Sequence, residues 1–231
     1  MVHVPSKNLV GRFNRLSVFL FSNWLIVVSI IFSFFVSLPF LAPVFMKYNL
    51  AVPARIIYSI YAFLCHQLPQ RSFFLFGKQL TYSLSEIRSV WFDTNNPFIL
   101  RQFIGTPEMG WKVAWSDRMV SIYFGALIIL WFRYFKKSLS RLLSWHKLLL
   151  IAFPIAADGF THMFSDIAGL GLGFRDSNRW LAVITNNTFT STFYAGDGWG
   201  SFNSIMRLAT GFIFGAGIVW FVTPYIDEQI Q

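Results

Sequence analysis

Four long apolar segments dominate the hydropathy pattern of this chain. The first, residues 23–46, contains no charged side chain over 24 residues, and about 20 helical residues suffice to cross a bilayer core. Three further apolar segments follow at residues 118–135, 148–167 and 205–225. The pattern predicts four transmembrane helices within a single membrane domain covering residues 1–231.

A shorter apolar segment, residues 51–68, contains Arg55 and His66, and the uncharged stretch between them is too short to cross a membrane. We expect an interfacial or re-entrant helix that packs on the bundle, because non-spanning backbone at membrane depth needs protein or water to satisfy its polar groups. The segments expected as long outer loops are 69–117, with one short helix at 84–92, and 168–204. The predicted fold class is an all-α integral membrane protein.

The composition excludes an ordinary soluble domain. Hydrophobic residues make up 55% of the chain and charged residues only 13%, with a mean hydropathy of +0.53, whereas soluble domains are about a quarter charged. The 28 phenylalanines and nine tryptophans provide surface for the lipid bilayer and for partner subunits. We attribute the net charge of +9 to the flanks of membrane spans rather than to nucleic-acid binding.

Basic residues indicate the orientation in the membrane. Residues 133–147 contain five lysines and arginines and no acidic residue, and the N-terminal segment carries only Lys7, Arg12 and Arg15 as charged side chains. Such segments face the cytoplasm, and four spans return both termini to the same side. We therefore expect a multi-pass cell-membrane protein with both termini cytoplasmic and the long loops outside.

The third span contains the clearest candidate chemistry. Asp158, His162 and Asp166 recur every fourth residue and so lie near one face of a helix. Ionisable groups within a span are costly and often functional, and this set suits a divalent metal or a proton relay. The structural alternative, which we favour, pairs Asp158 with Arg118 or Arg207.

A second candidate group lies at the end of the 51–68 segment, where Cys65 and His66 are adjacent. Cys65 is the only cysteine, so it forms no internal disulfide and no thiolate metal centre by itself. A buried thiol is also a common small hydrophobe. The candidate ligand cluster is His66, Asp158, His162 and Asp166, with possible support from Cys65, Arg71, Arg118 and Arg207.

The motif CHQLPQRS at residues 65–72 resembles the signature of an uncharacterised family of small prokaryotic membrane proteins, the domain of unknown function numbered 2085. The family pattern continues with a cysteine-containing block at the start of a span, an Asp-Gly motif, and Asn-x-x-x-Arg-x-x-Thr-Gly in the last span. The matching residues here are Arg118, Ile122, Tyr123 and Gly125, then Asp158 and Gly159, then Asn203, Arg207, Thr210 and Gly211.

The chain departs from that pattern at the two later cysteines, where it has Ser116 and Met119. The resemblance implies that family members holding those cysteines could assemble a zinc or iron centre with the Cys-His pair. Here the two thiolates are missing and the outer loops are longer. We interpret this combination as a membrane scaffold adapted for docking.

Three functions remain open from the sequence, and it leaves open whether the protein is an enzyme. The favoured one is a non-catalytic accessory or scaffold subunit of a larger membrane complex, in which a histidine could ligate haem or chlorophyll. The second is a metal-binding or metal-dependent membrane enzyme with a site in the outer leaflet, acting on an amphiphile. The third is a small transporter or channel, although the chain shows no repeated half and no acidic ring.

Overall fold

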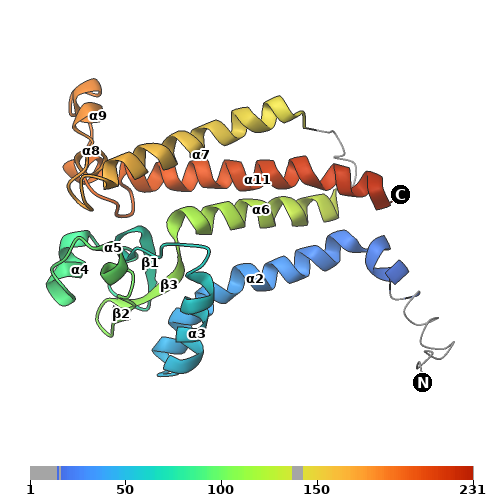
Figure 1. The fold of residues 1–231 in the computed structure, drawn as a ribbon, viewed down its shortest axis with the longest axis horizontal. Helices are drawn as coiled ribbons and strands as arrows, with labels where there is room; N and C mark the ends of the chain where they lie inside the picture. The colour runs from blue at the N-terminus through green and yellow to red at the C-terminus, as the bar shows by residue number, and fades with distance from the viewer. Residues whose placement is uncertain (1–14, 16, 137–142, 231) are drawn as a thin grey trace, which may run out of the picture.

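A computed structural model describes residue 15 and residues 17–136 and 143–230 of the 231-residue chain. Its frame is a bundle of four long helices that extend side by side along the long axis of the molecule (Figure 1). These helices are α2 (Trp24–Lys47), α6 (Asp117–Phe135), α7 (Trp145–Asp166) and α11 (Phe202–Ile230). Each is long and apolar enough to cross a membrane. The four predicted spans are therefore confirmed to within a few residues at most ends.

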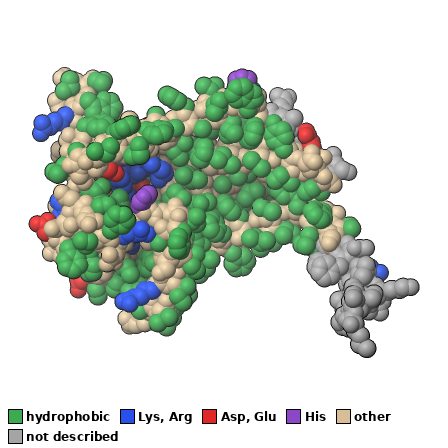
Figure 2. Space-filling view, in the orientation of Figure 1, with side chains coloured by type: hydrophobic (Ala, Val, Ile, Leu, Met, Phe, Trp, Pro, Cys, Tyr) green, Lys and Arg blue, Asp and Glu red, His purple; other side chains and the backbone are tan. Residues whose placement is uncertain are grey.

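The bundle has the surface expected of a protein in lipid. Figure 2 shows hydrophobic side chains over its middle, while charged side chains gather toward its two ends. Phe34 on α2 and Phe153 on α7 are about 70% exposed, as lipid-facing residues of a span would be in the absence of a bilayer.

Glycines on α11 allow it to approach α6 closely. A Cβ added at Gly215 would collide with the carbonyl oxygen of Ile122, and one added at Gly211 would collide with the Ser121 hydroxyl. On α6, a Cβ at Gly125 would meet the carbonyl of Phe212 in the same way. Small residues thus bring the two backbones together, as they do at many helix contacts in membranes.

The remaining elements, residues 51–116 and 167–201, lie at one end of the bundle (Figure 1). We call them the outer cap, a name that refers to this place at the end of the bundle and not to a side of the membrane. Its first half contains α3 (Ala51–Tyr61), the 3-10 helix η1 (Pro69–Arg71), β1 (Ser72–Leu75), α4 (Leu84–Val90), α5 (Pro97–Leu100), β2 (Gly105–Thr106) and β3 (Gly110–Ser116). Its second half contains α8 (Phe174–Ser177), α9 (Arg179–Ile184) and α10 (Ser191–Tyr194).

The segment predicted as one helix over 51–68 forms a helix only as far as Tyr61. The chain then turns through Gln67, which has a positive φ of 52°, and into η1, which begins at Pro69. A proline disfavours helical backbone in the residue before it, so the helix could not continue through Leu68. The short helix expected at 84–92 is present as α4, and its first turn is closed by a capping box between Ser83 and Glu86.

The outer cap also contains a small antiparallel sheet that the sequence pattern did not predict. The strand order is β1-β3-β2, with Phe74 opposite Lys112 and Gly105 opposite Trp111. β3 joins the sheet to the bundle, because its fully buried Trp115 stacks on Tyr123 of α6 with 4.4 Å between ring centroids. β2 has only two residues and β1 four, and β1 pairs with a strand about 40 positions further along the chain, so the sheet leaves little local periodicity.

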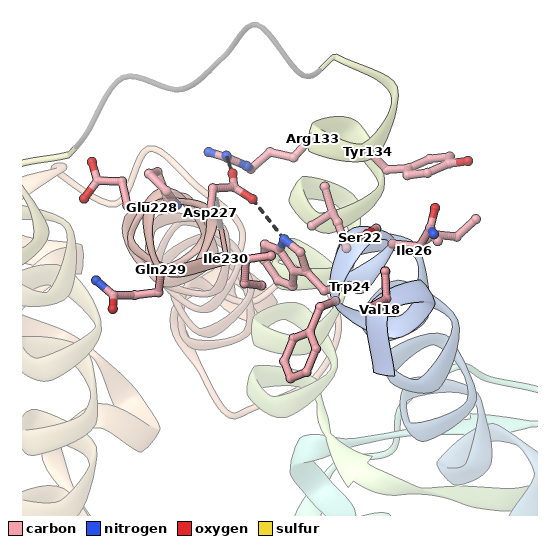
Figure 3. A pocket seen from close by; sticks show the side chains of 14 residues that line it. Val18, Ser22, Trp24, Ile26, Arg133, Tyr134, Asp227, Glu228, Gln229 and Ile230 are labelled. Atoms are coloured by element: carbon pink, nitrogen blue, oxygen red, sulfur yellow. Dashed lines mark hydrogen bonds and ion pairs between the residues drawn. The ribbon is translucent and has the colours of Figure 1, made fainter. Parts of the chain in front are cut away.

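The other end of the bundle is tied together by Asp227 of α11. Its two carboxylate oxygens accept hydrogen bonds from Trp24 Nε1 at 3.0 Å and from Arg133 Nη2 at 2.7 Å (Figure 3). These contacts join the start of α2, the end of α6 and the end of α11 beside a cavity of about 1090 Å³. Lys7, Arg12, Lys137 and Arg141, which contribute to the predicted orientation, lie outside the described residues.

Candidate functional site

The buried polar residues of α7 lie in the half of the helix that is nearer the outer cap. Asp158 is almost fully buried, and its two carboxylate oxygens accept from Arg118 Nη2 at 2.6 Å and Arg175 Nη2 at 2.7 Å. His162 lies on the same face, one turn along, with Nε2 3.8 Å from Asp158 Oδ1 and 3.1 Å from Arg175 Nη2. The predicted pairing of Asp158 with an arginine of the bundle is present, and Arg118 is that arginine.

Asp166, at the end of α7, is held by a different arginine. Arg71 of η1 donates both terminal nitrogens to the two Asp166 oxygens at 2.8 Å each. Its Nε donates to Asp197 Oδ2, also at 2.8 Å. One guanidinium group therefore joins the first half of the outer cap to α7 and to the loop that precedes α11, with the two-pronged geometry that makes arginine–carboxylate pairs strong.

Arg207 continues this chain of contacts into the bundle. Its Nη1 donates to Asp197 Oδ1 at 2.6 Å, and its Nε lies 2.8 and 2.9 Å from the two carboxylate oxygens of Asp117, the first residue of α6. The backbone N–H of Arg118 donates to Asp117 Oδ1 at 2.7 Å. These contacts are thereby connected to Asp158, which accepts from the Arg118 side chain.

These contacts form a single cluster of buried and partly buried side chains, which we call the arginine–aspartate network. Its members are Arg71, Arg118, Arg175, Arg207, Asp117, Asp158, Asp166 and Asp197. Four positive and four negative charges balance within it. Buried charges are tolerated when they are paired and hydrogen-bonded, so this arrangement reduces the desolvation cost of placing eight ions at the junction of cap and bundle.

The electrostatics of the cap side of the network follow from this pairing. Burial disfavours the ionised form of Asp197, but the guanidinium groups of Arg71 and Arg207 outweigh it and hold the pKa of Asp197 well below its ordinary value. Burial also opposes the charge on Arg71, yet Asp197 and Asp166 raise its pKa above the usual range. Both groups stay charged at physiological pH.

Amides fasten the second half of the outer cap around the network. Asn203 of α11 accepts from Arg175 Nε at 3.1 Å and donates to the carbonyl oxygens of Arg175 and Gly196 at 2.7 and 2.9 Å. Asn178, fully buried with a positive φ of 41°, donates to the carbonyls of Arg175 and Tyr194. The 174–203 segment is therefore held by specific polar contacts rather than lying as a free loop.

Three members of the network were not among the sequence candidates: Asp117, Arg175 and Asp197. Asp117 directly precedes Arg118 at the start of a span, and this position in the sequence could have identified it as a candidate. Arg175 and Asp197 lie in a glycine- and asparagine-rich segment whose course the hydropathy pattern does not define. Their roles depend on where that segment folds back.

The Cys-His pair lies apart from these contacts. His66 has an exposed side chain in the turn between α3 and η1. Cys65 is buried, and its Sγ lies 3.4 Å from the hydroxyl oxygen of Ser116, one of the two positions where the family pattern has a cysteine. Met119, the other such position, packs against the hydrophobic core that contains Cys65.

The donor set does not fit a metal ion. Within residues 15, 17–136 and 143–230, no group of three or more histidine, cysteine, aspartate or glutamate side chains could hold one. The physical reason is that the carboxylate oxygens of Asp158 and Asp166 already accept from arginines, and a cation placed among those guanidinium groups would be repelled. The predicted set of His66, Asp158, His162 and Asp166 does not converge on one point as a metal site.

Comparison with known proteins agrees with the resemblance seen in the sequence. Residues 108–221 match the family described as "Predicted membrane protein (DUF2085)". An uncharacterised protein of Methanocaldococcus jannaschii is 26% identical over 177 residues, covering 75% of this chain and 70% of its own length. No solved structure matches the chain. The part of the chain from β3 through most of α11 is therefore similar to the DUF2085 family of predicted membrane proteins.

Proposed function

We propose that this protein is a non-catalytic accessory or scaffold subunit of a larger membrane complex. One observation carries the proposal: the side chains best suited to chemistry, Asp158 and Asp166, accept hydrogen bonds from three arginines. A general base or metal ligand needs a lone pair directed at substrate or metal. Here those lone pairs connect protein segments to one another.

The arginine–aspartate network holds distant segments of the chain together. It joins η1, α6, α7, α8, the 195–201 loop and α11, which come from widely separated parts of the chain. A fixed outer cap is what a docking subunit requires, because a rigid surface loses less conformational entropy on binding. The cap also exposes large aromatic side chains: Phe92, two residues after α4, is 58% exposed, and Phe98, on α5, is 70% exposed. Other membrane subunits are the partners such a surface suits.

We place the outer cap on the non-cytoplasmic side and both termini in the cytoplasm. Support comes from Arg133, Lys136 and Lys147, which lie at the opposite end of α6 and α7 from the cap. Basic residues at span ends favour the cytoplasmic side.

Gentle detergent extraction of the native protein, followed by size separation with metal and pigment analysis of the same fraction, tests the proposal. We expect co-migration with larger subunits and no stoichiometric metal. Replacing Phe92 and Phe98 together by serine should release a small particle, whereas Phe153→Ser on the lipid-facing side of α7 should leave the large one intact.

The same measurement can also contradict the scaffold proposal. A small particle carrying about one metal ion per chain, with the metal lost in His162→Ala, would overturn the scaffold proposal and make the α7 cluster an active site. Asp158→Asn separates the two views further. A scaffold predicts lower abundance in the membrane, whereas a metal site predicts normal abundance with loss of metal.

A further inference from the structure

A cavity of about 680 Å³ lies beside the arginine–aspartate network, between α7, α11 and the α8–α9 segment. Its volume falls within the roughly 300–1,000 Å³ typical of small-molecule sites. The lining is mainly apolar, and its largest apolar contributors are Pro154, Phe174, Trp180, Phe202 and Met206. Asp158 and Arg175 form part of the wall and neutralise each other through a 2.7 Å ion pair.

The cavity lies along the cap-side half of α7, which is one of the four candidate membrane spans. Pro154 precedes Asp158 by one helical turn, so the cavity extends about 6 Å from the network toward the middle of the span. The neighbouring Phe153 and Phe160 on α7 are 71% and 59% exposed, as expected on a lipid-facing surface. We therefore expect the apolar part of the cavity to lie at the height of acyl chains.

The helix beside the cavity has the character of an interfacial element. α9 has no buried residue, and its Val183 and Ile184 are 78% and 73% exposed. It points away from the bundle, across the direction of the spans (Figure 1). Trp180 on this helix packs edge-on against Phe202 of α11, 5.9 Å between ring centroids. An apolar helix with a tryptophan near a span end fits the membrane interface.

One charge on the lining is left uncompensated. Arg179 lines the cavity with an exposed side chain, and no described carboxylate lies within salt-bridge distance of it. Ser177 lies beside it on the same lining. A guanidinium group at the interface pairs well with phosphate, to which it can donate two parallel hydrogen bonds.

We propose that this cavity binds one anionic phospholipid from the leaflet nearest the outer cap, with an acyl chain between α7 and α11 and the phosphate at Arg179. The apolar lining, the interfacial position and the unpaired arginine each match one part of such a molecule. The proposal does not depend on the scaffold function, since it concerns a lipid rather than a protein partner.

Native mass spectrometry of the delipidated full-length protein, titrated with phosphatidylglycerol or phosphatidylcholine, tests it. We expect one tightly retained phosphatidylglycerol and about fivefold weaker binding of phosphatidylcholine, the effect of roughly 1 kcal/mol per interfacial basic residue. Arg179→Gln should remove the preference while keeping weak binding of both lipids. Arg55→Gln, at an exposed arginine of α3 outside the cavity, is the matched control and should behave like the natural protein.

Ala157→Phe, which adds a ring inside the cavity, should abolish retention of both lipids at an unchanged unfolding temperature. Equal affinity for the two lipids, or the same preference in Arg179→Gln as in Arg55→Gln, would overturn the proposal. Tighter retention of oleate than of phosphatidylglycerol would also overturn it, by assigning the cavity to a fatty acid.

Discussion

Arg207 of α11 donates its Nε to the carboxylate of Asp117 at the start of α6, with both residues almost fully buried. The same guanidinium reaches Asp197 of the outer cap through Nη1. Two membrane spans and the cap therefore meet at one side chain. A change that leaves any of the three charges unpaired should affect the whole junction.

Asp117→Asn should destabilise the protein by about 3–5 kcal/mol, the usual cost of breaking a buried ion pair by removing one partner. The matched control is Asp93→Asn, because the Asp93 side chain is 92% exposed and lies 3.9 Å from Arg88. That control should change stability by no more than about 0.5 kcal/mol. Denaturant unfolding in detergent micelles measures both, and equal stabilities would show that the network contributes little.

Gly215→Ala should weaken the contact between α6 and α11, because the new methyl group collides with the carbonyl oxygen of Ile122. Overpacking of this kind costs about 1–3 kcal/mol. Gly159→Ala is the control, since its Cβ would meet only Arg118 Nη1 at an ordinary 3.5 Å. In an interior helical position alanine is favoured over glycine by up to about 1 kcal/mol. Thermal unfolding should therefore move in opposite directions for the two variants.

Lys112 should make stability depend on pH. It is fully buried on β3, where its Nζ donates to the carbonyls of Gln67 and Arg101 at 2.8 and 2.9 Å. Burial lowers the pKa of Lys112 to about 7; the nearby Cys65 acts to raise it and the charge of Arg101 to lower it further. Between pH 7 and about 10.5 the unfolded chain binds a proton there that the folded chain lacks, so stability should rise with pH by at most about 1.4 kcal/mol per pH unit.

Lys112→Met should flatten that dependence. The measurement is denaturant unfolding of both proteins at pH 7, 8, 9 and 10. Parallel curves for the natural protein and Lys112→Met would assign the slope to other groups and contradict the prediction.

Ser116→Cys should allow a disulfide with Cys65, since Cys65 Sγ already lies 3.4 Å from the Ser116 hydroxyl oxygen. Closing a loop of this length typically contributes about 2–4 kcal/mol. Mild oxidation should remove both free thiols from thiol-reactive labelling and raise the unfolding temperature, and a reductant should reverse both effects. Met119→Cys serves as a comparison at the other family cysteine position. Two thiols that stay free in Ser116→Cys after oxidation would contradict the prediction.

The proposed orientation can be checked by single-cysteine labelling in a Cys65→Ala background. Thr188→Cys in the outer cap should react in intact cells with a membrane-impermeant maleimide. Glu228→Cys near the end of α11 should react only after permeabilisation. Both positions have exposed side chains, so access across the membrane decides the result. The reverse pattern would place the cap in the cytoplasm.

The positions of Asp158 and His162 could be predicted from the sequence, because they depend only on residues close together along α7. Helical periodicity alone places Asp158 and His162 on one face, and both are buried there. A span that buries a carboxylate needs a cation nearby, which predicted Arg118 or Arg207 as the partner, and Arg118 is the one that pairs with Asp158. His66 did not join that face, because its distance from α7 depends on how the segment after Tyr61 turns, and no periodic pattern describes that turn.

The membrane character, the four spans and the short helix α4 were determined by sequence alone, because hydropathy and capping act between residues close along the chain. The sheet, the pairing of Arg71 with Asp166 and Asp197, and the cavity beside Arg179 were decided only by the tertiary structure. Each needs residues from distant segments to meet, as when Arg71 reaches Asp197, 126 positions away. Whether a charged side chain becomes a ligand or half of an ion pair depends on what folds against it, and local patterns of residues along the chain do not reveal that partner.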